Sequence, residues 1–174
     1  MKKIVSIVGM ALAVWLVAMA AEERENAKTS AKDKSSASVT TEQHVVVTPA
    51  DLEWADAPPG LPPGAKMAVL EGDPTKKGNF TVRLQAPARY QVPPHTHPTA
   101  EHITVISGTM NFGAGEKFDE AAGKEVSTGG YVVMPAGMKH YAWSSGEAII
   151  QIHGRGPFEI KYVNPADDPR NAKK

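Results

Sequence analysis

The sequence predicts an all-β protein with a single folded domain. Short apolar runs recur between residues 44 and 163, and clusters of Gly, Pro, Asn and Asp separate one run from the next. Many short strands at regular spacing are typical of a β-barrel or a β-sandwich. The same stretch shows no helical periodicity and no internal repeat, and a chain of 174 residues is long enough for one ordinary domain.

Several segments have the alternation expected of strands. The clearest is Phe80–Leu84, in which large and polar side chains alternate, as they do in a strand with one buried face. Turn-forming sequences such as Gly72-Asp73-Pro74 separate the segments. Only Asp51–Ala55 and Asp119–Ala122 are expected to form short helical turns. The expected strands are His44–Val47, Met67–Glu71, Phe80–Leu84, His102–Ser107, Thr109–Phe112, Tyr131–Met134, Tyr141–Trp143, Ile149–His153 and Phe158–Val163.

The N-terminus has the features of a secretory signal. Lys2 and Lys3 precede a long apolar run, and this run ends in the small-x-small sequence Ala18-Met19-Ala20, which signal peptidase accepts. We therefore expect a cleaved signal peptide over residues 1–20 and a periplasmic or secreted protein. The alternative is an uncleaved membrane anchor, because the run approaches the length of a short spanning helix.

Composition divides the rest of the chain. Residues 21–43 contain almost no large apolar side chain, so they cannot offset the entropy of ordering and are expected to form a disordered linker. After this linker we expect a barrel domain over residues 44–164 and a flexible polar tail over residues 165–174. The chain carries 19 basic and 19 acidic residues, so no basic field points to nucleic acid. A membrane is an expected partner only if the leader stays uncleaved.

Two histidines and a glutamate form the first candidate site. His95 and His97 are two residues apart, so in an extended strand their side chains point to the same side. Two neighbouring ligands of one metal require this arrangement. Glu101 opens the next expected strand, and if its side chain points inward, alternation turns His102 outward.

A second segment supplies another histidine. Pro135 and Gly137 follow Gly129 and form a tight turn at the start of a new strand. His140 comes just after this turn, from where it can supply a ligand across the barrel.

Together the two segments resemble the two-motif pattern of the cupin superfamily, H-x-H-x3-E-x6-G followed by G-x5-P-x-G-x2-H. The resemblance spans Arg89 to Ser144 and departs at both ends, where the family usually has Gly and Asn, respectively. It implies a jelly-roll barrel of roughly eight core strands with Greek-key connections. The metal ligands that it implies are His95, His97, Glu101 and His140.

The arrangement of leader, linker, single domain and Asp-Asp-Pro-Arg tail further resembles small secreted bacterial cupins of the cupin-2 type. Relatives are often dimeric through their outer strands, so the resemblance also implies a homodimer.

The chemistry of the ligands narrows the metal. The chain has no cysteine, so any metal is held by nitrogen and oxygen, and the combination of imidazole and carboxylate suits several transition metals. Iron or manganese is the expected divalent ion, with zinc or nickel as alternatives. Three neutral histidines and one carboxylate leave such an ion with a net charge of about +1. An octahedral ion with four protein ligands keeps open positions for water, dioxygen or a substrate.

Three residues are candidates for a catalytic role. Glu101 can remain a ligand or act as a base. His153 ends Ile149–His153, beside the expected barrel lining, and is either an acid–base group or a core histidine bonded to backbone. Tyr141 is either a hydrogen-bond donor to substrate or part of the aromatic packing of the wall.

The open positions favour a metal-dependent dioxygenase that acts on a small organic molecule. A lyase or isomerase could use the same ion as a Lewis acid. The alternative to an enzyme is a non-catalytic module that binds or senses a metal or a small ligand. The sequence does not choose between an enzyme and such a module.

Overall fold

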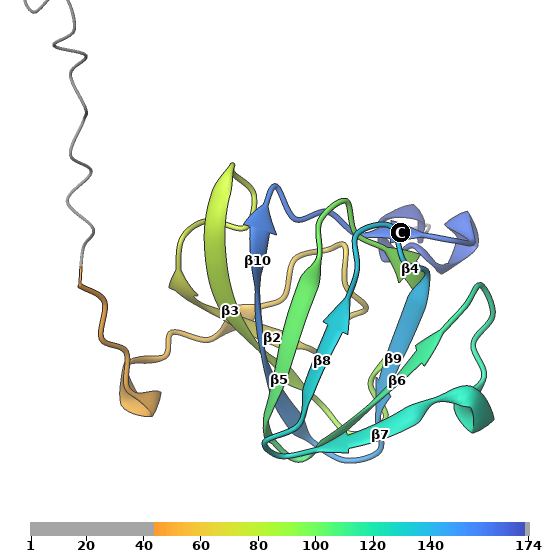
Figure 1. Ribbon diagram of the computed structural model, residues 1–174, viewed down its shortest axis with the longest axis horizontal. Coiled ribbons are helices and arrows are strands. Elements are labelled where there is room, and N and C mark those ends of the chain that lie inside the picture. The colour runs from red at the N-terminus through yellow and green to blue at the C-terminus, as the bar shows by residue number, and fades with distance from the viewer. Residues whose placement is uncertain (1–43, 173–174) are drawn as a thin grey trace, which may run out of the picture. The chain divides into compact units, whose positions relative to one another are not determined.

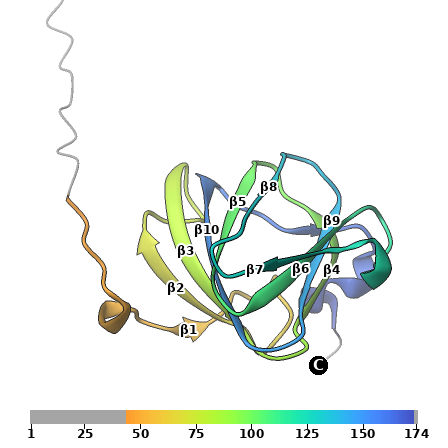
Figure 2. The ribbon, with the colours of Figure 1, turned by 60° about the horizontal axis from the view of Figure 1, so that its bottom comes forward.

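A computed structural model of the protein describes residues 44–172, which form two antiparallel sheets facing each other (Figure 1, Figure 2). One sheet has the order β1 (Ala55–Asp56), β2 (Lys66–Glu71), β3 (Gly78–Ala86), β10 (Ala148–Gly156), β5 (Glu101–Ser107), β8 (Tyr131–Met134). The other has the order β11 (Lys161–Tyr162), β4 (Gln91–Thr96), β9 (His140–Ser144), β6 (Thr109–Ala114), β7 (Lys124–Ser127). The predicted all-β jelly roll is confirmed.

Strand alternation directs the core into the space between the sheets. In β3 the side chains of Phe80, Val82 and Leu84 are buried, while the residues between them are partly exposed. β10 pairs with β3 in register, so Ile150 lies opposite Leu84 and Ile152 opposite Val82 on the same inner face. Full burial of one such aliphatic side chain contributes roughly 1.5–3 kcal/mol, and this shared apolar face holds the two longest strands together.

Two expected strands differ from the structure. Residues 44–47 form no strand, and Val45 and Val46 are 51% and 71% exposed, because no other described strand pairs with them. Of Phe158–Val163 only β11 pairs, with β4. The apolar residues before it, Phe158 and Ile160, instead line the interior cavity.

Other differences arise from local chemistry. Pro49–Asp51 forms a 3-10 turn. The backbone N–H and the hydroxyl of Thr48 both donate to the Asp51 carboxylate, and the Thr48 carbonyl accepts from the Asp51 amide. The expected helical turn at Asp51–Ala55 does not form. The turn expected at Asp119–Ala122 is confirmed as a 3-10 helix over Glu120–Ala122. β7 was not expected, because its sequence Lys-Glu-Val-Ser is mostly polar and only pairing with β6 defines it.

The C-terminal segment is ordered by its own contacts. Residues 165–174 were predicted to be a flexible tail, but Pro165–Asp167 and Pro169–Asn171 form two consecutive 3-10 turns. Arg170 Nη2 lies 2.7 Å from Asp168 and also donates to the carbonyl of Ile160 at 3.0 Å. The tail is thereby attached to the segment that precedes β11.

The predicted signal peptide and linker, residues 1–43, lie outside the described residues. Within residues 44–172, no helix has the length and apolar character needed to cross a membrane.

The two residues that depart from the cupin pattern, Arg89 and Ser144, meet at the turn between β3 and β4: Arg89 lies in this turn, and Ser144 contacts it. Arg89 has φ of 60°, in the left-handed region that glycine adopts without steric strain. Ser144 is buried, and its Oγ donates to the carbonyl of Pro87 at 2.8 Å and accepts from the amide of Tyr90 at 3.2 Å. Ser144 therefore holds the turn in which Arg89 is strained.

Replacing Arg89 with Gly is expected to raise the free energy of unfolding by about 0.5–1 kcal/mol, since relief of left-handed strain exceeds the entropic cost of Gly.

Replacing Ser144 with Ala is expected to lower the free energy of unfolding by about 1–2 kcal/mol, because two hydrogen bonds in a buried position are lost. Urea denaturation of both variants measures the two changes. A lower stability for Arg89→Gly would show that the turn is not strained.

Candidate metal centre

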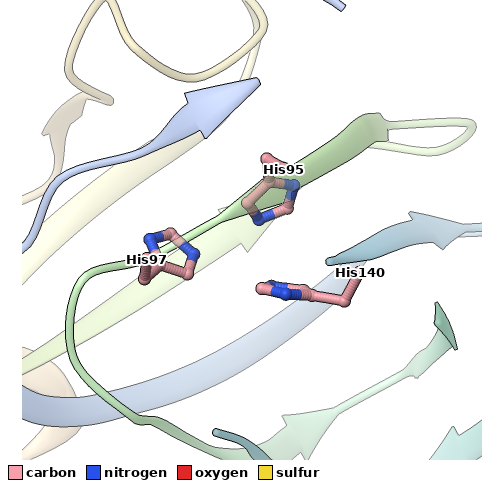
Figure 3. A group of neighbouring side chains, drawn as sticks. All are labelled: His95, His97 and His140. Carbon is pink, nitrogen blue, oxygen red and sulfur yellow. The ribbon is translucent and has the colours of Figure 1, made fainter. Parts of the chain in front are cut away.

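Four polar side chains from three neighbouring elements meet inside the barrel. His95 in β4 is paired across the sheet with His140 in β9, and their ring centroids are 4.2 Å apart. His97 follows the end of β4, and Glu101 is the first residue of β5. All four residues are buried. Figure 3 shows the three imidazoles turned toward one another.

Backbone carbonyls define the tautomer of each histidine. The Nδ1 atoms of His95, His97 and His140 lie 2.7, 2.7 and 2.9 Å from the carbonyl oxygens of Pro93, Glu159 and Met138. A carbonyl oxygen only accepts, so each Nδ1 carries the proton and donates it. Each Nε2 is then a free lone pair, which is the form in which imidazole binds a metal.

The free lone pairs lie within reach of one ion. Metal-ligating atoms of the three histidines all lie within 4.8 Å of one another. Glu101 Oε2 is 3.6 Å from His97 Nε2 and 3.4 Å from His140 Nε2. His140 Nε2 is fully buried and makes no hydrogen bond within the described residues. Because a buried polar atom without a partner is costly, this atom fits the role of a metal ligand.

Burial controls the charges of the cluster. It is the main cause that lowers the pKa of His95 to about 3, and repulsion from His140 and His97 adds to it. Burial also lowers the pKa of His97. In Glu101 burial acts to raise the pKa, but the neighbouring imidazoles outweigh it and the pKa is lowered. At neutral pH the centre therefore has neutral histidines at 95 and 97 and an ionised carboxylate, as metal binding requires.

The same shifts predict that acid destabilises the metal-free protein. The unfolded chain binds a proton at position 95 below pH 6.5, whereas folded His95 stays neutral down to about pH 3, so stability falls as the pH falls. Between pH 7 and pH 5 the loss from this residue is about 2 kcal/mol. Urea denaturation at both values measures it, with His95→Leu as the variant in which the difference shrinks. A stability that rises toward pH 5 would contradict the neutral, buried state.

The segment between β10 and β11 holds the centre from one side. The ring of Phe158 stacks on His97 with centroids 4.2 Å apart, and the next residue, Glu159, supplies the carbonyl that orients that imidazole. The hydroxyl of Tyr162 in β11 donates to the carbonyl of Gly60. The C-terminal tail, through Arg170, thus braces a segment that positions a candidate ligand.

The centre forms part of the wall of one apolar cavity of about 190 Å³ between the sheets. The inner faces of both sheets line it, together with Leu61, Pro74 and Phe158 from the connecting segments. A molecule in this cavity therefore contacts the four polar side chains on one side and apolar groups on the others.

His153, predicted beside the barrel lining as either an acid–base group or a core histidine, is not among the residues that line the cavity. β10 alternates Ile150 and Ile152 toward the interior, so His153 faces outward, where it is exposed. Its ring stacks on that of His102, its neighbour on β5, at 5.0 Å. The expected outward direction of His102 is confirmed, with its Nδ1 in a 2.6 Å hydrogen bond with the exposed Tyr131 hydroxyl.

Tyr141 also points away from the centre. In β9, His140 and Ala142 line the cavity, so alternation turns the Tyr141 side chain to the other face of that sheet. There it is fully buried against Phe118, and its hydroxyl donates to the carbonyl of Asp119 at 2.8 Å. Of the two roles expected for Tyr141, aromatic packing fits these surroundings. A hydrogen bond to a substrate in the cavity does not fit them, because the hydroxyl is on the other side of the sheet.

Two contributors to the site were missed in the sequence. Phe158 and the carbonyl of Glu159 both contact His97, although they lie about sixty residues further along the chain. Alternation of Phe158 and Ile160 with polar residues marked this segment as a strand with an apolar face. Nothing local indicated that this face covers the centre.

The comparisons with known proteins agree with this fold. A family model described as the ChrR cupin-like domain matches residues 42–159. No curated protein matches the chain. Among solved structures, the polyketide cyclase RemF from Streptomyces resistomycificus is 18% identical, with a TM-score of 0.60 over 73% of this chain and 90% of that chain.

Two further solved structures share the fold. A candidate acetylacetone dioxygenase from Methylibium petroleiphilum PM1 is 19% identical, with a TM-score of 0.56 over 73% of this chain and 85% of that chain. An RmlC-like cupin from Shewanella frigidimarina NCIMB 400 is 14% identical, with a TM-score of 0.51 over 65% of this chain and 91% of that chain. At these identities the likeness shows the fold alone. The family match covers most of the chain, and with it the protein belongs to the ChrR cupin-like domain family of the cupin superfamily.

Proposed function

We propose that the protein is a metal-dependent oxidoreductase that binds one divalent transition metal through His95, His97, Glu101 and His140 and acts as a dioxygenase on a small organic molecule. One observation carries the proposal. Three imidazoles with free Nε2 atoms converge beside a buried carboxylate, and they do so at the wall of an apolar cavity rather than in a filled core. A purely structural metal site would be closed on all sides.

The protein's own groups have distinct tasks in this proposal. A bound metal supplies Lewis acidity and, if it is iron, redox chemistry with dioxygen. The carbonyls of Pro93, Glu159 and Met138 hold the imidazoles in the ligating tautomer. The apolar walls exclude water and orient the substrate toward the cluster. Glu101 is the one acid among the described cavity-lining residues, so it is the side chain that can accept a substrate proton.

The predicted leader over residues 1–20 supports a periplasmic or secreted location. Iron or manganese stays the preferred metal, with zinc or nickel as alternatives. The homodimer implied by the family resemblance also stays a prediction. The names of two solved structures of the same fold, a polyketide cyclase and a candidate acetylacetone dioxygenase, are in line with small organic molecules as substrates.

Elemental analysis of the purified protein, followed by oxygen uptake with defined metals, tests the proposal. We expect one metal ion per chain, and oxygen consumption with Fe(II)-loaded protein and a panel of diketones, phenols and thiols. Zn(II)-loaded protein is the matched control, because zinc occupies the site without redox chemistry. Metal retention without oxygen uptake from any compound would refute the dioxygenase and favour a lyase, an isomerase or a binding module.

A further inference from the structure

The wall of the cavity is almost entirely apolar outside the candidate centre. Apart from the four side chains of the candidate centre, Thr75 is the one polar residue that lines it within residues 44–172. The rest of the wall is apolar, with Met67 from β2, Leu84 from β3 and Ile152 from β10 as examples. Among the residues that the structure describes, no lysine, no arginine and no amide side chain lines it. A ligand can therefore form polar contacts at one end of the cavity and almost nowhere else.

Charge limits the ligand further. A divalent ion held by three neutral imidazoles and the Glu101 carboxylate keeps a net charge of about +1. A ligand that carries one negative charge neutralises the centre. A second ionised group on the same ligand would lie against an apolar wall with no cation to pair with, and burying an unpaired charge is strongly unfavourable.

Size gives a third limit. The cavity measures about 190 Å³, and an apolar cavity of about 150 Å³ accommodates benzene. A ligand about as large as benzene, or slightly larger, fills the space. The ring of Phe158, stacked on His97, forms part of the wall beside the centre.

From these limits we infer the substrate class of the site, an inference that rests on the proposed function. The substrate is a compact apolar molecule whose only ionisable group is an oxygen function that loses one proton, such as an enolisable diketone. The oxygen end lies at the cluster of His95, His97, Glu101 and His140, and the hydrocarbon body lies against the apolar wall. Sugars, amino acids and dicarboxylates are outside this class, because each brings polar or charged groups for which the wall has no partner.

A matched pair of ligands tests the inference by binding rather than by turnover. Heptane-2,4-dione and 4,6-dioxoheptanoate share the same diketone and differ in a methyl group against a carboxylate at the far end. Each is titrated into Zn(II)-loaded protein in a calorimeter. We expect the carboxylate compound to bind at least about tenfold more weakly than the neutral one. Equal or tighter binding of the carboxylate compound would overturn the inference.

A variant that places a cation in the wall sharpens the test. Met67 lines the cavity from β2 and is only partly buried, and lysine has a similar length with a mobile charged end. Met67→Lys is expected to improve binding of 4,6-dioxoheptanoate about tenfold relative to Met67→Leu, which keeps the wall apolar. No gain for Met67→Lys in a folded protein would count against a wall that discriminates by charge.

Metal titration beforehand separates the two proposals. If zinc binds and the ligand preference fails, the inference on substrate class is overturned and the metal centre stands. If no metal binds, the proposed function is overturned. In that case the same ligand pair is titrated into the metal-free protein, which tests the charge preference of the cavity wall alone. The neutral compound is again expected to bind better, and the opposite order would overturn the inference.

Discussion

Replacing His140 with alanine is expected to weaken the binding of a divalent metal at least about 100-fold. Loss of a residue that only hydrogen-bonds to a metal ligand already weakens metal binding about 10- to 100-fold, and loss of a ligand itself should cost at least as much. His140 Nε2 is buried without a hydrogen-bond partner in the described structure and lies 3.4 Å from Glu101 Oε2. The opposing strand places it against His95. The variant thus removes one of the four candidate ligands. Competition with a chelator of known affinity, followed by elemental analysis, measures the loss.

His153→Ala is the matched control for this prediction. It removes the same side chain from the same barrel, but at an exposed position on the outer face of β10. Its metal affinity is expected to equal that of the unchanged protein. His140→Gln, which fills more of the space than alanine, guards against a loss caused by unfolding. Equal metal affinity of His140→Ala and His153→Ala would refute the assignment of His140 as a ligand.

Replacing Gly113 with alanine is expected to destabilise the barrel by about 2–3 kcal/mol, because overpacking a well-packed interior forces side chains and backbone to shift. A Cβ at Gly113 in β6 would overlap the ring and hydroxyl of Tyr141. That ring is fully buried, packs against Phe118 and is tied by its hydroxyl to the carbonyl of Asp119. Its burial and these two contacts restrain any movement of the ring away from an added Cβ.

Gly146→Ala is the control for Gly113→Ala. A Cβ at Gly146 meets no atom within 4 Å, so its effect is expected to stay within about 0.5 kcal/mol. Urea denaturation of the two variants gives the difference in the free energy of unfolding. Similar stabilities would show that the Tyr141 ring can move away from β6 and is not rigidly packed behind the sheet.

The all-β class of the fold and the identity of the clustered residues could be read from the sequence, because both depend on short-range geometry. Side chains two apart in a strand share a face, so the spacing of His95 and His97 already placed them together. The same rule turned His102 outward, as the structure shows. The cupin motifs then related His140 to the first segment, and the structure brings it within the same group. Metal binding by this group stays a prediction.

Positions that depend on partners from distant strands could not be read in this way. Alternation gives two faces to a strand but does not say which face meets the interior, and that choice placed His153 in solvent and Tyr141 behind the sheet. β7, with its polar sequence, is defined only by pairing with β6. The C-terminal turns depend on the contact of Arg170 with the segment before β11.

By itself, therefore, the sequence determined the all-β fold, the family and the set of polar residues that cluster, since local alternation and motif spacing encode these. Only the tertiary structure decided the protonation and the surroundings of that cluster. The carbonyl of Glu159 orients His97 from a segment about sixty residues away, and side chains from both sheets build the apolar cavity beside it. Burial and long-range packing arise only when distant segments meet, so no local pattern records them.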